Sequence, residues 1–534
     1  MPASKGRSGR ESPPLGCAAP ANRYASRMPS RPLSHPSDSA TAYSGHPTKD
    51  GGLPFWRTSV LLLLAAVALR AWDWGNPVIH VDEQYYLLVG DRMLHGALPY
   101  VDIWDRKPIG LFLLFAGFRL LPGDGILAYQ LAATLAAAAT AIVVAAGART
   151  LGAKDRGAIV AGLAYLVGLS LLGGRGGQAP VFYNLPIAIS GLITVRLPWR
   201  GTAGIVTGGA VACLLAGFAI QMKYTPAVEG AFFGLAHGWA LWRRQVGATK
   251  LIAAVALWIA LGLAPTLAAI GWYWMHGALP AFWFANFGSI ALRPGYPFAE
   301  WSMRLLGIAA QLAPLAVAAV LAWRTRSRAA PRATAMQFAV GWPAAALFGF
   351  AAIGTFFDHY ALPLLAPLCI VAAPALGPSV RIAIGVLGPM LLLWTVQLAT
   401  RRDDAAGARL VAATVAANSE DGCPYVFIGD TITYLLSRTC LPTAYAFPNL
   451  LAYTTEQGAT GIDEAAEVRR ILARRPPVIV TSDRRLQIWN RESRATLLAA
   501  VATDYRLVLK VPRSGWRTLV YLRRDRAFRR AAPR

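Results

Sequence analysis

The sequence predicts a polytopic α-helical membrane protein with about eleven transmembrane helices and a small C-terminal α/β domain. Of its 534 residues, 55% are hydrophobic and only 15% are charged, and the mean hydropathy is +0.42. A soluble protein of this length is far less apolar. Apolar runs alternate with short basic clusters over most of the chain, and the last segment, 401–534, has the composition of a soluble domain.

The chain begins with a polar segment, residues 1–52, that is rich in Ser, Pro, Gly and Arg. This segment has no apolar periodicity, so we expect a disordered cytoplasmic tail. The first apolar run, residues 60–69, is short and follows basic residues, as in a signal peptide. Because no small-residue cleavage site comes after it, we expect an uncleaved first transmembrane span.

Basic residues recur at alternate loops of the membrane module, residues 53–400, and these loops should be cytoplasmic. The intervening loops, including 276–301, are poorer in Lys and Arg. An odd number of crossings then puts the N-terminus in the cytoplasm and the segment 401–534 outside. The basic clusters are Arg149, Lys154 and Arg156; Arg196 and Arg200; Arg243, Arg244 and Lys250; Arg324, Arg326, Arg328 and Arg332; and Arg381.

The net charge of +25 is explained by these clusters together with anionic lipid headgroups. Nucleic-acid binding would need basic residues along one continuous face, and they do not form one. We therefore expect membrane lipids, and no nucleic acid, as partners.

The last segment has the element pattern of a small α/β domain. Residues 406–417 and 463–473 are typical of helices, and residues 425–428, 477–481, 506–511 and 518–522 are typical of strands. Cys423 and Cys440 both lie here and form a candidate disulfide if the domain faces an oxidising compartment. Two free buried thiols are the alternative.

Most of the outward charge lies in the first outer loop, residues 73–108. Asp82 and Glu83 follow the first span closely, the stretch 85–95 is typical of an amphipathic helix on the membrane, and Arg106 and Lys107 come just before the next span. Acidic and basic groups are thus held at the level of the lipid headgroups. A solvated loop with ordinary surface charges is the alternative.

A carboxylate beside cations at this level fits the transfer of a sugar from a lipid phosphate. Asp82 would take the proton from an attacking acceptor hydroxyl, and Lys107 and Arg106 would stabilise the departing phosphate. Direct attack would invert the anomeric configuration. The sequence has no phosphate-binding glycine loop and no D-x-D element, which argues against a soluble nucleotide-sugar donor.

Three elements of this loop resemble a known family: the D-E pair at residues 82–83, G-x-x-P-Y-x-D at 96–102 and W-D-R-K-P at 104–108. They are similar to the first periplasmic loop of GT-C glycosyltransferases, in particular the bacterial members of the protein O-mannosyltransferase superfamily. This is glycosyltransferase family 39, which includes the lipid A aminoarabinose transferase. The resemblance implies a multi-pass bacterial inner-membrane enzyme that uses a polyprenyl-phosphate sugar and acts on a glycan, lipid or protein acceptor. It makes Asp82 the catalytic aspartate, Glu83 its acidic neighbour and Lys107 a donor-phosphate ligand.

Other positions fit the family pattern loosely. Lys223, in Q-M-K-Y-T-P, is a candidate donor-phosphate ligand, with a snorkelling lysine as the alternative. His359 and Tyr360, in D-H-Y-A-L-P, are candidate substrate contacts, with an interfacial histidine as the alternative. Further candidate contacts within the first loop are Tyr85, Asp102 and Asp105.

The sequence departs from the family at one point. Many relatives carry an acidic residue in the outer loop before the fourth span, whereas this chain has Gln178 and Asn184. A second carboxylate is missing there, which argues against acceptor binding or metal assistance by a carboxylate at that point. We assign no metal ligand and no cofactor, and the use of a divalent cation stays open.

Two other classes of protein, a transporter and a scaffold, are alternatives to the enzyme. A transporter or flippase for a lipid-linked glycan would also be polytopic and basic, but it should show internal repeats and ionisable residues at mid-membrane depth. A scaffold that binds an envelope partner would leave the charged first loop unexplained. The placement of charge at the outer interface favours the enzyme.

Overall fold

The computed structural model describes residues 53–401, 404–484 and 488–531. The expected disordered tail, 1–52, lies outside the described residues. Helices make up most of the first of these ranges. Its longest helices are α1 (Phe55–Arg70), α4 (Ile126–Thr150), α5 (Asp155–Leu171), α6 (Ala179–Val195), α7 (Thr202–Ile220), α8 (Pro226–Arg243), α9 (Ala248–Met275), α12 (Phe298–Arg324), α13 (Arg332–Ile353), α14 (Leu362–Leu376) and α15 (Val380–Thr400).

Among the described residues, seven helices are long and apolar enough to cross a membrane: α1 extended to Asp73, α4, α7, α9, α12, α13 and α15. Apolar segments form helices in a bilayer because every backbone polar group must then be bonded within the segment. The prediction of a polytopic helical membrane protein is confirmed. The number eleven requires α5, α6, α8 and α14 to cross as well, and it stays a prediction.

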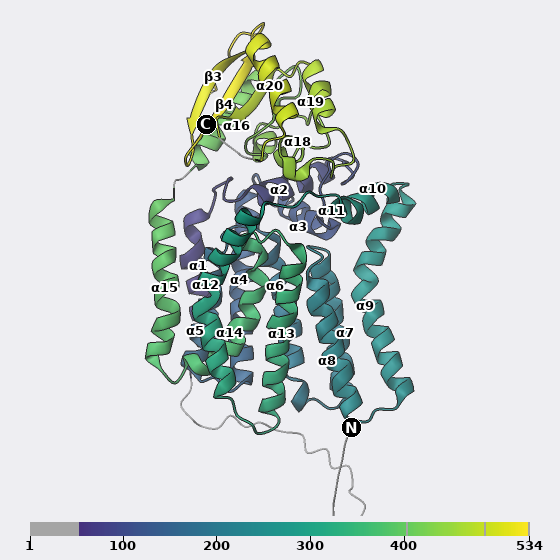
Figure 1. Cartoon of the computed structure of the whole chain (residues 1–534), viewed down its shortest axis with the longest axis vertical. Coiled ribbons are helices and arrows are strands. Elements are labelled where there is room, and N and C mark those ends of the chain that lie inside the picture. The colour runs from purple at the N-terminus through teal and green to yellow at the C-terminus, as the bar shows by residue number, and fades with distance from the viewer. Residues whose placement is uncertain (1–52, 402–403, 485–487, 532–534) are drawn as a thin grey trace, which may run out of the picture. The chain divides into compact units, whose positions relative to one another are not determined.

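The membrane helices differ in how much of their surface other helices cover. The Ala-rich α4 packs against α1, α5, α6 and α14, and 56% of its apolar window is buried. Small side chains let helices approach closely where no water drives them together. In contrast, only 11% of the apolar window of α9 is buried, and α9 stands at the edge of the helix layer in Figure 1. Most of its surface is therefore available to lipid.

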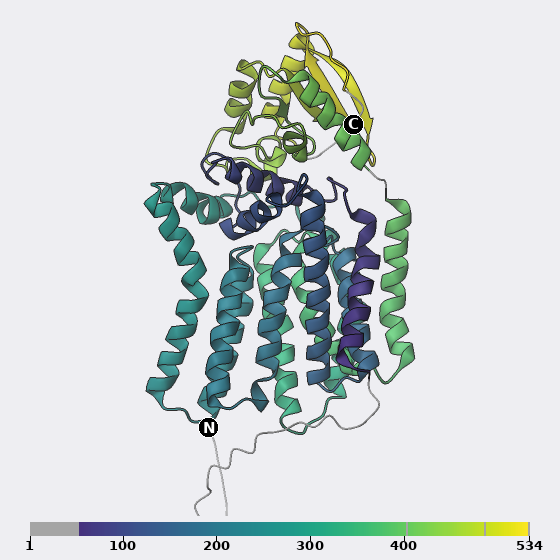
Figure 2. The same ribbon diagram turned by 180° about the vertical axis from the view of Figure 1, so that it is seen from behind.

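Short helices gather at one end of the helix layer, between it and the C-terminal domain, as both views show (Figure 1, Figure 2). They are α2 (Val81–Leu94), α3 (Ile109–Arg119), α10 (Leu279–Trp283), a π-helical turn (Phe284–Gly288) and α11 (Ser289–Ala291). The start of α2 is set by His80, whose Nδ1 accepts the backbone N–H of Asp82. Acidic side chains in the first turn, Asp82 and Glu83, also suit the positive end of the helix dipole.

The C-terminal domain is a four-stranded sheet with helices, as predicted. The strand order is β1-β2-β4-β3, with β1 and β2 parallel and the other two pairs antiparallel. Ile479 of β2 pairs with Tyr521 of β4. The elements are α16 (Ala405–Asn418), β1 (Tyr425–Val426), α17 (Ile432–Leu436), α18 (Pro448–Ala452), α19 (Glu464–Ala473), β2 (Val478–Ser482), α20 (Arg491–Asp504), β3 (Tyr505–Pro512) and β4 (Arg517–Arg523).

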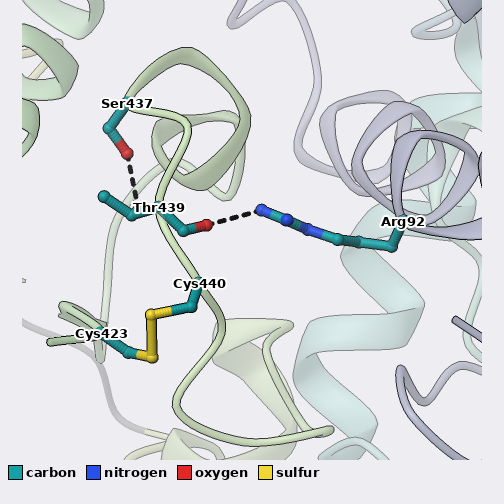
Figure 3. Close-up of a disulfide and its surroundings, with 5 residues drawn as sticks. All are labelled: Arg92, Cys423, Ser437, Thr439 and Cys440. Atoms are coloured by element: carbon teal, nitrogen blue, oxygen red, sulfur yellow. Dashed lines mark hydrogen bonds between the residues drawn. A yellow bond between two sulfur atoms is a disulfide. The ribbon is translucent and has the colours of Figure 1, made fainter. Parts of the chain in front are cut away.

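A disulfide joins Cys423 and Cys440 in this domain. It closes the segment that contains α17, and α17 packs against α2. At the end of this segment, the backbone carbonyl of Thr439 accepts a hydrogen bond from Nη2 of Arg92 at 2.6 Å (Figure 3). The disulfide-closed segment therefore rests directly on the helix that carries Asp82.

Candidate active site

Asp82 lies in the first turn of α2, and its carboxylate contacts side chains from two distant segments as well as its own. Oδ2 accepts a hydrogen bond from Nε2 of Gln178 at 3.3 Å, just before α6. The same oxygen lies 3.7 Å from Nε2 of His359, which is in the 3-10 turn Asp358–Tyr360, and 3.8 Å from Nδ1 of His80. Helix packing thus brings these polar groups around one carboxylate.

The two histidines differ in the hydrogen bonds that they can make. Nδ1 of His80 accepts the N–H of Asp82 and contacts the amide of Gln178, so this nitrogen carries a lone pair and cannot donate to the carboxylate. Nε2 of His359, 3.7 Å from Oδ2 of Asp82, can turn an N–H toward this carboxylate. Within the part of the chain that the structure describes, no group of three or more His, Cys, Asp or Glu side chains could hold a metal ion.

The carboxyl group of Asp82 is held ionised. Burial alone would raise its pKa, but His80, Lys107, His359 and the Gln178 amide outweigh burial and lower the pKa below the usual value. Burial also lowers the pKa of His80 and, more strongly, of His359. Among the basic side chains around Asp82, Lys107 is therefore the one whose charged form is favoured. Burial would lower the pKa of Lys107, but Asp82 and Tyr360 raise it instead.

Lys223 places a second amine near the same carboxylate. Its Nζ lies 3.6 Å from the centroid of the Tyr360 ring, a cation–π contact. Burial and the charge of Lys107 lower the pKa of Lys223 well below its usual value. An incoming anion would raise the pKa of Lys223, so that this amine would take up a proton and become a second positive charge beside Lys107.

Glu83 faces away from this group, into the protein. Its side chain is fully buried and accepts the backbone N–H of Gly177. A Cβ on Gly176 would overlap the Glu83 carboxylate, so the Glu83 side chain would have to move to admit one. Burial raises the pKa of Glu83 to about 8. Glu83 thus supports the segment that contains Gly177 from inside the protein, and its raised pKa favours the neutral carboxyl group.

Hydrogen bonds to two side chains, Arg70 and Glu83, hold the segment 174–178 in place. Nη1 and Nη2 of Arg70 donate to the carbonyl oxygens of Gly174 and Gly176, at 2.5 and 2.6 Å. Glu83 accepts the next N–H in the same segment. These bonds fix the position of Gln178, and Gln178 in turn holds Asp82.

The W-D-R-K-P element sends its charged side chains in different directions. Asp105 lies close enough to Lys107 to interact with its charge, although burial raises the pKa of Asp105. Arg106 turns away: its Nη1 donates to Glu456 of the C-terminal domain, and its Nε donates to Ser289 at 3.0 Å. The guanidinium expected at the donor phosphate is thus paired with a carboxylate in this structure.

Tyr85 and Asp102 stabilise the loop itself. The buried Tyr85 hydroxyl donates to the carbonyl oxygen of Trp104 at 2.8 Å. Asp102 is exposed, and its Oδ2 accepts the N–H of Leu98 at 2.7 Å within a turn. Among the described residues, the structure brings Lys107, Lys223, His359 and Tyr360 to the Asp82 group, whereas Tyr85 and Asp102 make their hydrogen bonds within the first loop.

Sequence reasoning missed three residues that shape this region. Gln178 was noted only because relatives carry an acidic residue in its loop. Its position in that outer loop, just before α6, is the signal that could have placed it beside Asp82. Arg293 lies in an outward loop whose relation to the first loop is set only by folding. Glu456 belongs to no motif.

The fold is that of a GT-C membrane protein, so the resemblance expected from the first loop is confirmed at the level of the fold. Two solved structures of ArnT from Cupriavidus metallidurans share it. One, bound to undecaprenyl phosphate, has a TM-score of 0.57 and 16% identity and covers 90% of this chain and 98% of its own. The other, in the apo state, has a TM-score of 0.58 and 15% identity and covers 86% and 97%.

A further likeness is weaker and carries no weight here. The Archaeoglobus fulgidus oligosaccharyltransferase, in complex with Zn and sulfate, has a TM-score of 0.44 and 12% identity, and the match covers 79% of this chain and 67% of that one. No known family profile and no curated protein sequence matches the chain.

Proposed function

We propose that this protein is a membrane glycosyltransferase that moves a sugar from a polyprenyl-phosphate carrier to a hydroxyl of a glycan, lipid or protein acceptor. The observation that carries the proposal is the group at one end of the membrane helix layer: the Asp82 carboxylate beside His359, with Lys107 close enough for the two charges to interact and Lys223 stacked on Tyr360. An ionised base and an anion site at the headgroup level are what this reaction needs. The ArnT structure with undecaprenyl phosphate adds weight to a lipid-phosphate donor.

In the proposed reaction, Asp82 removes the proton from the acceptor hydroxyl while that oxygen attacks the anomeric carbon. The bond between this carbon and the phosphate oxygen breaks, and the phosphate leaves with the electron pair. Lys107 and Lys223 stabilise the charge that develops on the phosphate. Attack from the side opposite to the phosphate inverts the anomeric configuration.

The lowered pKa of Asp82 is compatible with a role as a base. A carboxylate with so low a pKa is always ionised but is a weak proton acceptor. A donor phosphate beside Lys107 would offset the positive charge that lowers this pKa. Binding of the donor would therefore raise the pKa of Asp82 and make it a better base at the moment of attack.

The proposed orientation follows the basic loops. Arg149, Arg196 and Arg243 lie at the C-terminal ends of α4, α6 and α8. The loops that follow these ends are the ones expected to be cytoplasmic. The Asp82 group and the C-terminal domain would then face the periplasm of a bacterial inner membrane. The donor would reach the site from the surrounding lipids.

Release of free carrier lipid tests the proposal. Purified protein in proteoliposomes is given a panel of polyprenyl-phosphate sugars with an acceptor extract, and carrier phosphate is measured. We expect release from one donor and appearance of its sugar on the acceptor. Passage of an intact lipid-linked sugar across the bilayer, with no carrier released, would instead indicate a transporter.

A further inference from the structure

Glu456 of the C-terminal domain binds two arginines at the edge of the Asp82 region. It lies in the 3-10 turn Thr454–Glu456, and its side chain is only 7% exposed. Oε2 accepts from Nη1 of Arg106, and Oε1 accepts from Nη2 of Arg293 at 2.7 Å. Each oxygen of one buried carboxylate thus holds one guanidinium.

The two arginines come from different membrane-module segments, and both lie near Lys107. Arg106 directly precedes Lys107 in the sequence and lies over the Trp104 ring at 4.9 Å. Arg293 lies in the segment 279–293, between α9 and α12, and its charge acts on Lys107. Glu456 therefore joins the first loop, a second loop and the C-terminal domain at one point.

The segment 279–293 is also held at two other places. Oδ1 of Asn286 accepts from the hydroxyl of Tyr224 at 2.6 Å, next to Lys223 in the sequence. Ser289 accepts from Nε of Arg106 at 3.0 Å. These contacts connect the segment to the sequence neighbours of Lys223 and Lys107, the two lysines that we assign to the donor phosphate.

We propose that Glu456 is a positioning residue for the donor site. It holds the segment 279–293 against the first loop, through Arg293 and through Arg106, the residue that directly precedes Lys107. This gives the C-terminal domain a part in donor binding, and it rests on the proposed function. Without the carboxylate, two partly buried guanidinium groups would repel each other and the segment would move outward.

A competing explanation makes the opposite prediction. If the Glu456 carboxylate occupied the place of the donor phosphate, its neutralisation would free both arginines and tighten donor binding. If Glu456 positions these segments, its neutralisation weakens donor binding. The sign of the change in donor KM therefore decides between the two.

The test compares full-length wild type, Glu456→Gln and a control, Glu420→Gln, which removes an exposed carboxylate paired with Arg529 in the same domain. Hydrogen exchange of the segment 279–293 is measured without donor, and donor KM and kcat are measured with it. For Glu456→Gln we expect faster exchange in this segment and a donor KM raised about tenfold or more, with kcat at saturation within about twofold. The control should match the wild type in both.

Unchanged exchange, an unchanged KM or a lowered KM would overturn the proposal. A uniform loss of thermal stability with wild-type KM would show a structural role alone and would overturn it too. The exchange measurement needs no donor. If no donor is turned over by the wild type, the proposed function fails, while the tie made by Glu456 is still tested by itself.

Discussion

Asp82 and Glu83 are adjacent in the sequence, and the structure gives their carboxyl groups opposite surroundings. Asp82 faces Lys107 and the amide of Gln178, and its pKa is lowered. Glu83 is fully buried against Gly177, and its pKa is raised to about 8. Two neighbouring acids with separated pKa values are typical of sites that need one ionised and one neutral group.

The buried Glu83 predicts a particular dependence of stability on pH. Its folded-state pKa of about 8 lies above the unfolded value of 4.5. The contribution of Glu83 to the free energy of unfolding is therefore complete below pH 4.5 and is lost as the pH rises through about 8. Glu83→Gln removes this contribution. Thermal unfolding in detergent at about pH 5 and about pH 9 should show a smaller fall in Tm for the variant than for wild type. Equal falls would contradict the assignment.

Gln178 predicts a shift in the pH profile of turnover. In Gln178→Glu, a second carboxylate replaces the amide that now donates to Asp82 at 3.3 Å, and like charges this close raise the pKa of one of them. Because the active form of Asp82 is ionised, the acidic limb of kcat/KM should move to higher pH by about 1 to 2 units. Gln178→Leu, which removes only the hydrogen bond, should shift it less. An unmoved limb for Gln178→Glu would count against Asp82 as the base.

At the scale of elements, α2 and α3 pack with their backbones in contact. A Cβ on Gly90 of α2 would lie 2.5 Å from the backbone nitrogen of Ala116 in α3. Gly90→Ala should therefore push the two helices apart and lower the free energy of unfolding by about 1 to 3 kcal/mol.

A matched control for this change lies in α3. A Cβ on Gly117 would meet no atom within 4 Å, so Gly117→Ala should be neutral or slightly stabilising. Thermal unfolding of both variants checks the prediction. Similar Tm values for the two variants would mean that the close approach of α2 and α3 is not required.

The sequence predicted the helix of the first loop, but its start was placed too late. The apolar pattern suggested residues 85–95, whereas α2 begins at Val81. The cause is the cap made by His80, which periodicity does not reveal. Because Asp82 and Glu83 both lie in the first turn of this helix, their side chains point in different directions. Asp82 contacts Gln178, and Glu83 contacts the backbone of Gly177.

Much of the C-terminal domain was also visible in the sequence, because its strands are apolar and locally defined. The segments of β2, β3 and β4 lie close to the predicted ones. The parallel pairing of β1 with β2 was not readable, since these strands are joined by a long connection. Such long-range pairing depends on the whole domain.

For the candidate site, the sequence could indicate residue types but not which of them meet. Asp82 and Lys107 share one loop, so their proximity was expected. Lys223 and His359 reach the same place only because the membrane helices pack in one particular order. The pairing of Arg106 with Glu456 could not be predicted, because it crosses from the first loop to the C-terminal domain.

At the scale of the whole molecule, the C-terminal domain forms hydrogen bonds to α2, the helix that carries Asp82, as well as to the loops. Nε2 of Gln84, in α2, donates to Asp430 at 3.3 Å, and Asp430 is paired with Arg513 of the sheet hairpin. Both Asp430 and Thr439 lie in the segment closed by the disulfide. The domain thus supports α2 from the side opposite to the membrane helices.

The measurement that tests the central claim most directly is turnover by Asp82→Asn. Asn keeps the size of the side chain but cannot accept a proton, so carrier release should fall by at least about a hundredfold, while Tm stays near that of wild type. Asp463→Asn, which keeps a helix cap in the C-terminal domain, is the control and should retain activity. Wild-type release by Asp82→Asn would contradict the account, because no other group was assigned to remove the acceptor proton.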